Sequence, residues 1–310
     1  IALDGVSLSA QDSKITTVIG ANGAGKSTLL RTISGLEHPS SGSITWEGQS
    51  IVGRRPEDIV QMGIAHVPEG HAVISELSVE EKAEVLSTWG NGVLADLKKG
   101  TSQDHVGRAL IDTVNRFDIP HEHFEAFLHS MTMDLTVQEY ESYEDLIEYV
   151  YGSAAVIGLE MVPILGPLHN DAFEAAKKLG IAFQLANFIR DIGEDIERGR
   201  IYMPLDELAR YGVSEDMLLR RELTPEIIEA IKFQISRVRD LQAKANAGIE
   251  YLDPISRPCI RAASELYCGI VDEIEANGYD IFNKRAKTST WRRLRVAGLA
   301  FIQTLFLRLR

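Results

Sequence analysis

The sequence predicts a mainly helical protein that carries a short α/β segment at its amino-terminal end. After about residue 82, long stretches such as "LTPEIIEAIKFQISRVRDLQAKANAGIEYL" have helical periodicity and few β-branched runs. Before that point, short β-branched runs alternate with turns rich in Gly and Ser. We therefore expect two units, residues 1–81 and 82–310, with no Pro-, Gly- or Ser-rich linker between them.

The composition is that of an ordinary globular protein with an acidic balance. Hydrophobic residues make up 45% and charged residues 25% of the 310 residues, and the formal net charge is −13. This charge argues against a general nucleic-acid-binding protein, which needs a basic surface. Cys259 and Cys268 provide neither a disulfide framework nor a metal-binding spacing, which indicates a reducing compartment and a cytoplasmic location. We find no signal peptide and no apolar run of about 18 residues that could span a bilayer.

The amino-terminal segment contains four short predicted elements. "KITTVIG" (14–20) is a β-branched run that leads into a Gly-rich turn, and "KSTLLRTISGL" (26–36) is helical in period. "GSITWEGQSI" (42–51) is typical of a hairpin, and "GIAHVPEG" (63–70) is typical of a buried strand. This order predicts the strand–loop–helix start of an α/β fold.

A phosphate-binding pattern joins the first strand to the helix. "GANGAGKS" (20–27) fits G-x-x-x-x-G-K-[ST], whose glycines allow backbone N–H groups to surround phosphate oxygens. Lys26 would reach the terminal phosphates and the hydroxyl of Ser27 would hold Mg²⁺. The alternative is a Gly-rich turn without a ligand. The candidate nucleotide-binding residues of this loop are Gly20, Asn22, Gly23, Gly25, Lys26, Ser27 and Thr28.

Residues 1 to about 81 resemble the amino-terminal third of an ABC-transporter ATPase subunit of the branched-chain amino-acid type. Under this resemblance, Glu69 in "HVPEG" takes the place of the Q-loop glutamine and joins the nucleotide-binding residues. The later motifs of that family, which are the signature sequence, the acidic residue that orients water and the switch histidine, do not follow in the chain. We therefore expect a truncated P-loop fragment without ATP hydrolysis, in which ATP binding is vestigial.

A second motif lies in "QLANFIRDIGEDIERGR" (184–200). Gln184, Asn187, Asp191 and Asp195 are spaced by three, four and four residues, so they share one face of a helix, and Arg190 borders that face. Two carboxylates one turn apart beside an amide oxygen suit Mg²⁺, which in turn holds a diphosphate. The alternative is a solvated acidic face whose carboxylates form salt bridges, with Arg198 and Arg200 as their partners.

The chain from about residue 82 to 310 resembles the squalene/phytoene synthase family, nearest its phytoene synthases. The resemblance rests on four blocks in the expected order, which are "HSMTMDLTVQEYESYEDLIEYV" (129–150), "EYVYGSAAVIGLEMVPILG" (148–166), "AFQLANFIRDIGEDIERGRIYMP" (182–204) and "YDIFNKRAKTSTWRRL" (279–294). It implies an all-α terpenoid-synthase-like bundle. The bundle is incomplete, because sequence of another kind replaces its first helices.

The resemblance also implies an activity. Family members condense two prenyl diphosphates head to head, and the nearest members make phytoene from geranylgeranyl diphosphate for carotenoid biosynthesis. The cofactor would be Mg²⁺, which Mn²⁺ can replace. By position, the implied catalytic residues are Tyr149, Asp191 and Asp195, the two aspartates being the metal ligands, and the implied diphosphate-binding residues are Gln184, Asn187, Arg190 and Arg285. As alternatives to these roles, Tyr149 would be a tyrosine of the core and Arg285 a cation on the surface.

The chain departs from the family at the first aspartate-rich motif. Asp191 and Asp195 form its only D-x-x-x-D pair, and the nearest substitute, Asp118 with Glu122, is interrupted by Pro120, which disfavours a helix. We therefore expect a prenyltransferase whose activity is impaired. Two alternatives remain open, which are an ABC-type ATP-binding subunit that docks on a membrane permease and a fusion without a function of its own.

The carboxyl end, "WRRLRVAGLAFIQTLFLRLR" (291–310), combines cations with a largely apolar run over residues 296–309. One interpretation is a final helix packed on the core of the bundle. The other is a helix that contacts a membrane surface, which would suit an enzyme with apolar substrates.

Overall fold

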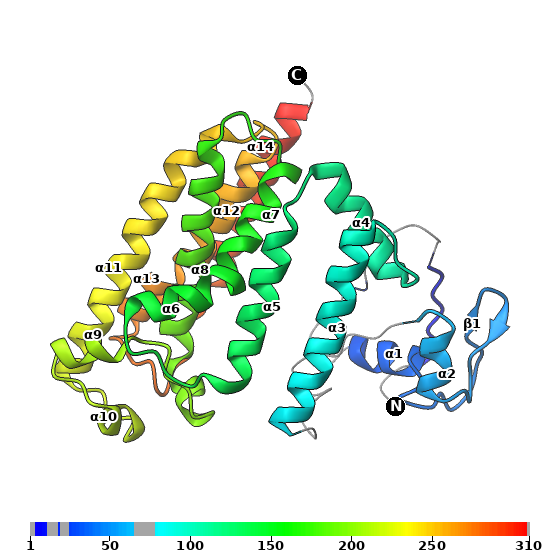
Figure 1. Cartoon of the computed structure of the whole chain (residues 1–310), viewed down its shortest axis with the longest axis horizontal. Helices are drawn as coiled ribbons and strands as arrows, with labels where there is room; N and C mark the ends of the chain where they lie inside the picture. Colours follow the sequence, from blue (N-terminus) through cyan, green and yellow to red (C-terminus); the bar gives the residue numbers. More distant parts are fainter. Residues whose placement is uncertain (1–3, 11–17, 19–24, 65–77, 309–310) are drawn as a thin grey trace. The chain divides into compact units, whose positions relative to one another are not determined.

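The computed structural model describes residues 4–10, 18, 25–64 and 78–308, and Figure 1 shows its helices and strands. The chain separates into two compact units, Ile1–Glu76 and Leu77–Arg310.

The amino-terminal unit contains two short helices and a hairpin. Helix α1 (Lys26–Ile33) follows Gly25, whose φ of 86° lies in the left-handed region that favours glycine. Strands β1 (Thr45–Trp46) and β2 (Gln49–Ser50) pair antiparallel, and α2 (Pro56–Gln61) follows.

The structure therefore confirms the predicted helix after the loop and the predicted hairpin. No parallel sheet forms within residues 25–64, which are the part of this unit that the structure describes most continuously. The predicted first strand (14–20, apart from residue 18) and most of the predicted strand 63–70 lie outside the described residues. So do four predicted site residues, namely Gly20, Asn22, Gly23 and Glu69.

The second unit is a bundle of helices, as the sequence predicts. Two of its helices begin with a complete capping box, in which Ser78 and Ser142 each accept a hydrogen bond from the third helical N–H. In chain order the elements are α3 (Val79–Lys99), α4 (His105–Phe117), α5 (His121–Thr136), α6 (Tyr143–Val150), η2 (Tyr151–Ala155), α7 (Val156–Ile164), α8 (Asp171–Glu197), α9 (Leu205–Arg210), α10 (Glu215–Leu219), α11 (Pro225–Gly248), η3 (Ile249–Tyr251), α12 (Arg257–Cys268), α13 (Ile270–Ala276) and α14 (Thr290–Arg308).

Helix α8 lies at the centre of this bundle. It packs along α11, as Figure 1 shows, and also contacts η2, α7, α12 and α13. Leu185 and Ile189 of α8 share one apolar cluster with Ile231 and Ile235 of α11, and all four side chains are buried. Because α8 is covered on several sides, polar residues on it must be paired or must face a site.

The elements α6, η2 and α7 form one continuous helix, Tyr143–Ile164. Among the described helices, it is the one long and apolar enough to cross a bilayer by length and composition. It is not the apolar run of about 18 residues that the sequence lacks, because acidic residues interrupt it, namely Glu144, Asp145, Glu148 and Glu160. Leu146, Val150 and Val156 are buried in this helix, as expected for a helix in the core of a bundle.

The proposed substitute for the first aspartate motif is not a helical pair. Helix α4 ends at Phe117, Asp118 has a left-handed φ of 51°, and α5 begins at His121 after Pro120. Asp118 and Glu122 therefore belong to different segments, as the proline predicted.

Gly152 offers a test of the packing between η2 and α5. A Cβ at residue 152 would lie 2.0 Å from the carbonyl oxygen of Ala126, which is backbone and cannot move aside easily. We expect Gly152→Ala to lower the free energy of unfolding by about 2–3 kcal/mol through overpacking. Urea denaturation followed by circular dichroism measures the change.

The matched control is Gly92→Ala in α3, where no atom lies within 4 Å of the added Cβ. There, alanine should stabilise the helix by about 0.5–1 kcal/mol. Equal effects of the two substitutions would contradict the close approach of η2 and α5.

Candidate active site

The structure places the four predicted polar residues on α8. Gln184 and Asn187 line one cavity, and Asp191 and Asp195 follow in the next two turns. The side chains of Asp191 and Asp195 are only 18% and 14% exposed. The face predicted from the spacing of three, four and four residues is therefore a largely buried one, unlike the solvated face of the alternative interpretation.

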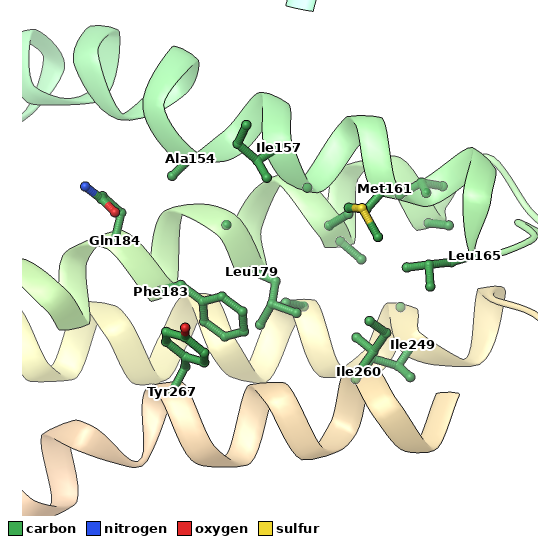
Figure 2. A pocket seen from close by; sticks show the side chains of 18 of the residues that line it. Ala154, Ile157, Met161, Leu165, Leu179, Phe183, Gln184, Ile249, Ile260 and Tyr267 are labelled. Carbon is green, nitrogen blue, oxygen red and sulfur yellow. The ribbon is translucent and has the colours of Figure 1, made fainter. Parts of the chain in front are cut away.

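An apolar cavity of about 340 Å³ adjoins this face and lies among η2, α7, α8, α11 and α12. Figure 2 shows Gln184 at one end of the cavity and Leu165 and Ile260 at the other. Close helix packing forms its walls, since a Cβ at Gly180 would lie 2.5 Å from the carbonyl oxygen of Ala154. Such a cavity suits an apolar molecule with one polar end.

The polar end of the cavity contains an amide without a partner. Oδ1 of Asn187 is buried and makes no hydrogen bond to any described residue. A buried polar atom normally has a hydrogen-bond partner, so an orphaned one beside a cavity indicates a place for a ligand, an ion or water. Asn187 comes one turn before Asp191 on α8, so its amide oxygen belongs with the carboxylates.

Two arginines hold Asp191. Nε of Arg190 donates to Oδ1 of Asp191 at 2.8 Å, and Nε of Arg285 donates to the same oxygen at 3.0 Å. Burial raises the pKa of Asp191, but these guanidinium groups outweigh it and hold the pKa below its ordinary value. The structure thus brings together Arg190, Asp191 and Arg285, and Arg285 is not an isolated surface cation.

Asp195 has the opposite electrostatic situation. Burial, followed by the negative charge of Asp191, raises the pKa of Asp195 to about 6, although Arg198 and Arg200 lower it. Arg198 lies 3.8 Å from Asp195, so the salt bridge of the alternative interpretation is present. The charges near Asp195 do not compensate for its burial. A divalent cation bound there would therefore stabilise its ionised form.

The residues fit Mg²⁺ in type. Asp191, Asp195 and Asn187 offer carboxylate and amide oxygens, and Mg²⁺ commonly uses one or two carboxylates together with substrate phosphates. In the described part of the chain, no group of three or more His, Cys, Asp and Glu residues is arranged to hold a metal ion. A metal here would therefore depend on ligands that a phosphate or water supplies.

Tyr149 lies in an aromatic cluster and does not line the cavity of Figure 2. Its ring centroid lies 5.7 Å from that of Tyr140, 5.9 Å from Tyr202 and 6.3 Å from Phe188, which belongs to α8. Burial, followed by the negative charge of Asp134, raises the pKa of Tyr149 far above its ordinary value. Its hydroxyl is therefore neutral at physiological pH.

The sequence of residues 70–292 matches the squalene/phytoene synthase family. The chain belongs to the squalene/phytoene synthase family.

Curated members of the family include plant phytoene synthases. Phytoene synthase 2, chloroplastic, of Oryza sativa subsp. japonica is 39% identical over 207 residues, which are 65% of this chain and 52% of the relative. Phytoene synthase, chloroplastic, of Narcissus pseudonarcissus is 39% identical over 69% of this chain and 52% of the relative. The chain thus spans about half the length of these relatives.

Solved structures of the family share the fold of the second unit. A dehydrosqualene synthase with a bound ligand matches 77% of this chain and 82% of its own, with a TM-score of 0.66 and 24% identity. Squalene synthase HpnC from Alicyclobacillus acidocaldarius matches 63% of this chain and 74% of its own, with a TM-score of 0.60 and 24% identity. The predicted mainly helical class is confirmed, with folds like those of squalene and dehydrosqualene synthases, whereas the predicted α/β P-loop fragment is not supported.

A group of polar side chains that the sequence did not predict joins α5 to the segment that follows α8. Nη1 of Arg200 donates to Oδ1 of Asp134 at 2.9 Å and to the hydroxyl of Tyr202 at 2.7 Å. The ring of Tyr202 stacks on Phe188, with centroids 4.2 Å apart. The blocks "MTMDL" and "GRIYMP" contain these residues, but no spacing within the chain marks them as neighbours.

The pKa of Asp195 predicts an unusual pH dependence of stability in metal-free buffer. The folded chain keeps the proton of Asp195 up to about 6, whereas the ordinary value is 3.8, so the folded state binds more protons between these pH values. The free energy of unfolding must then fall as pH rises through this window. Asp195→Asn should remove this loss and be more stable than the wild type at about pH 7.5, by up to about 3 kcal/mol, with little difference at about pH 4.

Urea denaturation at the two pH values measures the difference. The control is Asp240→Asn, which removes an exposed carboxylate that pairs with Lys244 on α11. A constant difference between Asp195→Asn and the wild type across this range would contradict the buried state of Asp195.

Proposed function

We propose that the chain is a head-to-head prenyltransferase that condenses two molecules of geranylgeranyl diphosphate to phytoene. The supporting observation is the continuity of two environments on α8, where Asn187 and Asp191 follow directly on the apolar cavity that begins at Gln184. A prenyl diphosphate has this same division between a charged head and an apolar chain. Family membership and the plant phytoene synthases among the relatives favour the phytoene reaction.

The diphosphate head would lie against the arginines of the α8 face. Arg190 and Arg285 present their guanidinium groups at Asp191, and guanidinium groups bind phosphate oxygens in bidentate geometry. The amides of Gln184 and Asn187 would orient the head at the mouth of the cavity. Mg²⁺ (or Mn²⁺), held by Asp191 and Asp195, would stabilise the negative charge that develops on the leaving diphosphate.

The prenyl chain would occupy the cavity, whose apolar walls keep water from the allylic cation. In the proposed reaction, the first diphosphate leaves with its bonding electron pair, the allylic cation alkylates the double bond of the second prenyl diphosphate, and loss of a proton to the released diphosphate closes the cyclopropane ring. The second diphosphate then leaves, and rearrangement with loss of another proton would give phytoene.

The rings that line the cavity, Phe183 and Tyr267, would stabilise positive charge through their faces. Tyr149, in contrast, packs on Phe188 outside the cavity and would act only by supporting this part of the site. Members of the family have two aspartate-rich motifs, whereas this chain has only the pair on α8, so we expect slow turnover.

We propose that the amino-terminal unit is a truncated P-loop fragment whose nucleotide binding is vestigial. Lys26, Ser27 and Thr28 form the first turn of α1 after the left-handed Gly25, as the motif requires. No step of prenyl transfer needs these residues. This unit therefore separates the proposed function from the ABC-type alternative, because only that alternative depends on Lys26.

We propose further that α14 contacts a membrane surface, while the chain remains cytoplasmic; the names of the plant relatives place those proteins in the chloroplast. Val296 is buried in α14, but seven large apolar side chains are exposed, namely Trp291, Leu294, Leu299, Phe301, Ile302, Leu305 and Phe306. The helix has four arginines and no acidic residue, in a chain whose net charge is −13. An exposed apolar surface beside cations suits the interface of an anionic bilayer.

The activity is tested by incubating the purified chain with geranylgeranyl diphosphate and Mg²⁺ and extracting phytoene and its cyclopropyl precursor. Asp191→Ala should lower the rate by at least about 100-fold, because it removes a metal ligand and the partner of two arginines. Lys26→Ala and Asp240→Ala should keep the wild-type rate. Farnesyl diphosphate in parallel reactions tests the shorter substrate.

Two outcomes would count against this proposal. No product from the wild-type chain, with an intact phytoene synthase active beside it, would leave a family fold without catalysis, as in a fusion without function. A loss of activity in Lys26→Ala would instead favour a nucleotide-dependent role.

The membrane contact is tested by flotation with vesicles of phosphatidylcholine and phosphatidylglycerol. Phe301 and Phe306 are 70% and 65% exposed, so their apolar surface is available to lipid. Burying such a side chain contributes about 1.5–3 kcal/mol, so Phe301→Asp should weaken binding at least about tenfold, and Phe306→Asp likewise. Trp89→Asp on α3, where the side chain is 59% exposed, is the control and should still float with the vesicles.

A further inference from the structure

The loop of residues 281–285 carries Arg285 to the aspartate face of α8. Ile281 and Phe282 are buried in the main apolar cluster, which anchors the start of the loop. Oδ1 of Asp280 accepts hydrogen bonds from the backbone N–H and the side-chain amide of Asn283, both at 3.1 Å, which shapes the turn. Arg285 then reaches Asp191 at the end of the loop, with Nε 3.0 Å from Oδ1.

Gly193 allows this loop to lie directly on α8. A Cβ at residue 193 would lie 2.7 Å from the carbonyl oxygen of Ile281 and 3.2 Å from Cα of Phe282, both backbone atoms of the loop. A glycine inside a helix costs about 0.5–1 kcal/mol relative to alanine, and this close approach is the reason for its presence between Asp191 and Asp195. Any side chain there would push the loop, and Arg285 with it, away from the helix.

Arg221 ties the loop to the helix. Its Nη2 donates to the carbonyl oxygen of Phe282 at 2.5 Å, and its Nη1 donates to the carbonyl oxygen of Gly193 at 3.2 Å. One planar guanidinium thus joins both sides of the contact, which the shorter reach and single nitrogen of a lysine could not reproduce. Nη1 also pairs with Glu197, whose side chain is 63% exposed.

The backbone at Arg221 is in a conformation that arginine rarely adopts. Its φ is 56°, in the left-handed region, where a residue with a Cβ is less stable than glycine. The local turn would therefore favour glycine, but glycine would lose the hydrogen bonds that the arginine side chain donates to the carbonyl oxygens of Gly193 and Phe282. That side chain lines a groove of about 240 Å³ together with Arg190 and Arg285, yet in the described structure it pairs with neither Asp191 nor Asp195.

We infer that Arg221 is a positioning residue for the diphosphate site, because it holds the 281–285 loop on Gly193 and thereby keeps Arg285 over Asp191. This inference rests on the proposed function. A diphosphate bound beside Asp191 would find Arg285 already in place, so its guanidinium would exchange the carboxylate for a phosphate oxygen without moving the backbone. Without Arg221, the loop would have to be ordered at the moment of binding, and the binding would be weaker by that cost.

The test measures the affinity of the chain for inorganic pyrophosphate in the presence of Mg²⁺ by calorimetry. Arg221→Ala should weaken binding about tenfold, as is typical when a group that orients a ligand is removed. Arg221→Gly, which relieves the backbone but removes the guanidinium, should weaken it equally, and Arg221→Lys should recover only part of the affinity. The matched control is Arg220→Ala. Arg220 directly follows α10, and its side chain pairs with Asp216 of that helix at 3.1 Å.

A double-mutant cycle separates positioning from direct contact. If Arg221 acts through Arg285, the pair Arg221→Ala and Arg285→Ala should bind no more weakly than Arg285→Ala alone. Hydrogen exchange of the loop amides should also become faster in Arg221→Ala and in Arg221→Gly, and not in Arg220→Ala.

Additive losses in the cycle, or wild-type affinity in Arg221→Gly, would overturn the inference and leave the proposed function untouched. A wild-type chain that binds no pyrophosphate with Mg²⁺ would overturn the proposed function itself, and the inference with it.

Discussion

The carboxylate pair of α8 imposes the strongest constraint on the rest of the bundle. Asp191 and Asp195 lie one turn apart in a helix that is covered on several sides, and their side chains are only 18% and 14% exposed. Burial of two like charges is unfavourable unless cations compensate for it. The structure supplies these cations from α8 itself, from the segment after it and from the 281–285 loop, as Arg190, Arg198, Arg200 and Arg285. The compensation is unequal, because Asp191 has two close arginines whereas the pKa of Asp195 is raised.

The same helix divides its length between two kinds of environment. Its first half presents alanines and glycines, such as Ala172, Ala176 and Gly180, to the apolar cavity, because small residues allow neighbouring helices to approach and still leave space. Its second half carries the amide and carboxylate groups. Since both halves belong to one rigid element, the distance between the polar head and the apolar chain of a ligand is set by the rise of the helix. Shifts of single loops would not change it.

Local spacing was sufficient to predict the α8 face, since a helical period places residues three and four apart on one side. The hairpin β1–β2, the helix α1 and the break at Pro120 also followed from local rules. Tertiary neighbours did not. Nothing in the spacing of the chain joins Asp134 to Arg200, 66 residues later, or Arg221 to Phe282, 61 residues later. Arg285 was found only because a family block contains it, and the aromatic surroundings of Tyr149 depend on how three separate segments pack.

We propose that one ligand spans the carboxylate face and the apolar cavity of α8. A crystal structure of the chain with Mg²⁺ and a non-hydrolysable thio-analogue of geranylgeranyl diphosphate tests it most directly. We expect the diphosphate against Asn187, Arg190 and Asp191, and the prenyl chain in the cavity that runs from Gln184 towards Leu165. A prenyl chain bound elsewhere, for example in the apolar groove between α3, α4 and α5, would show that the α8 cavity is not the substrate site.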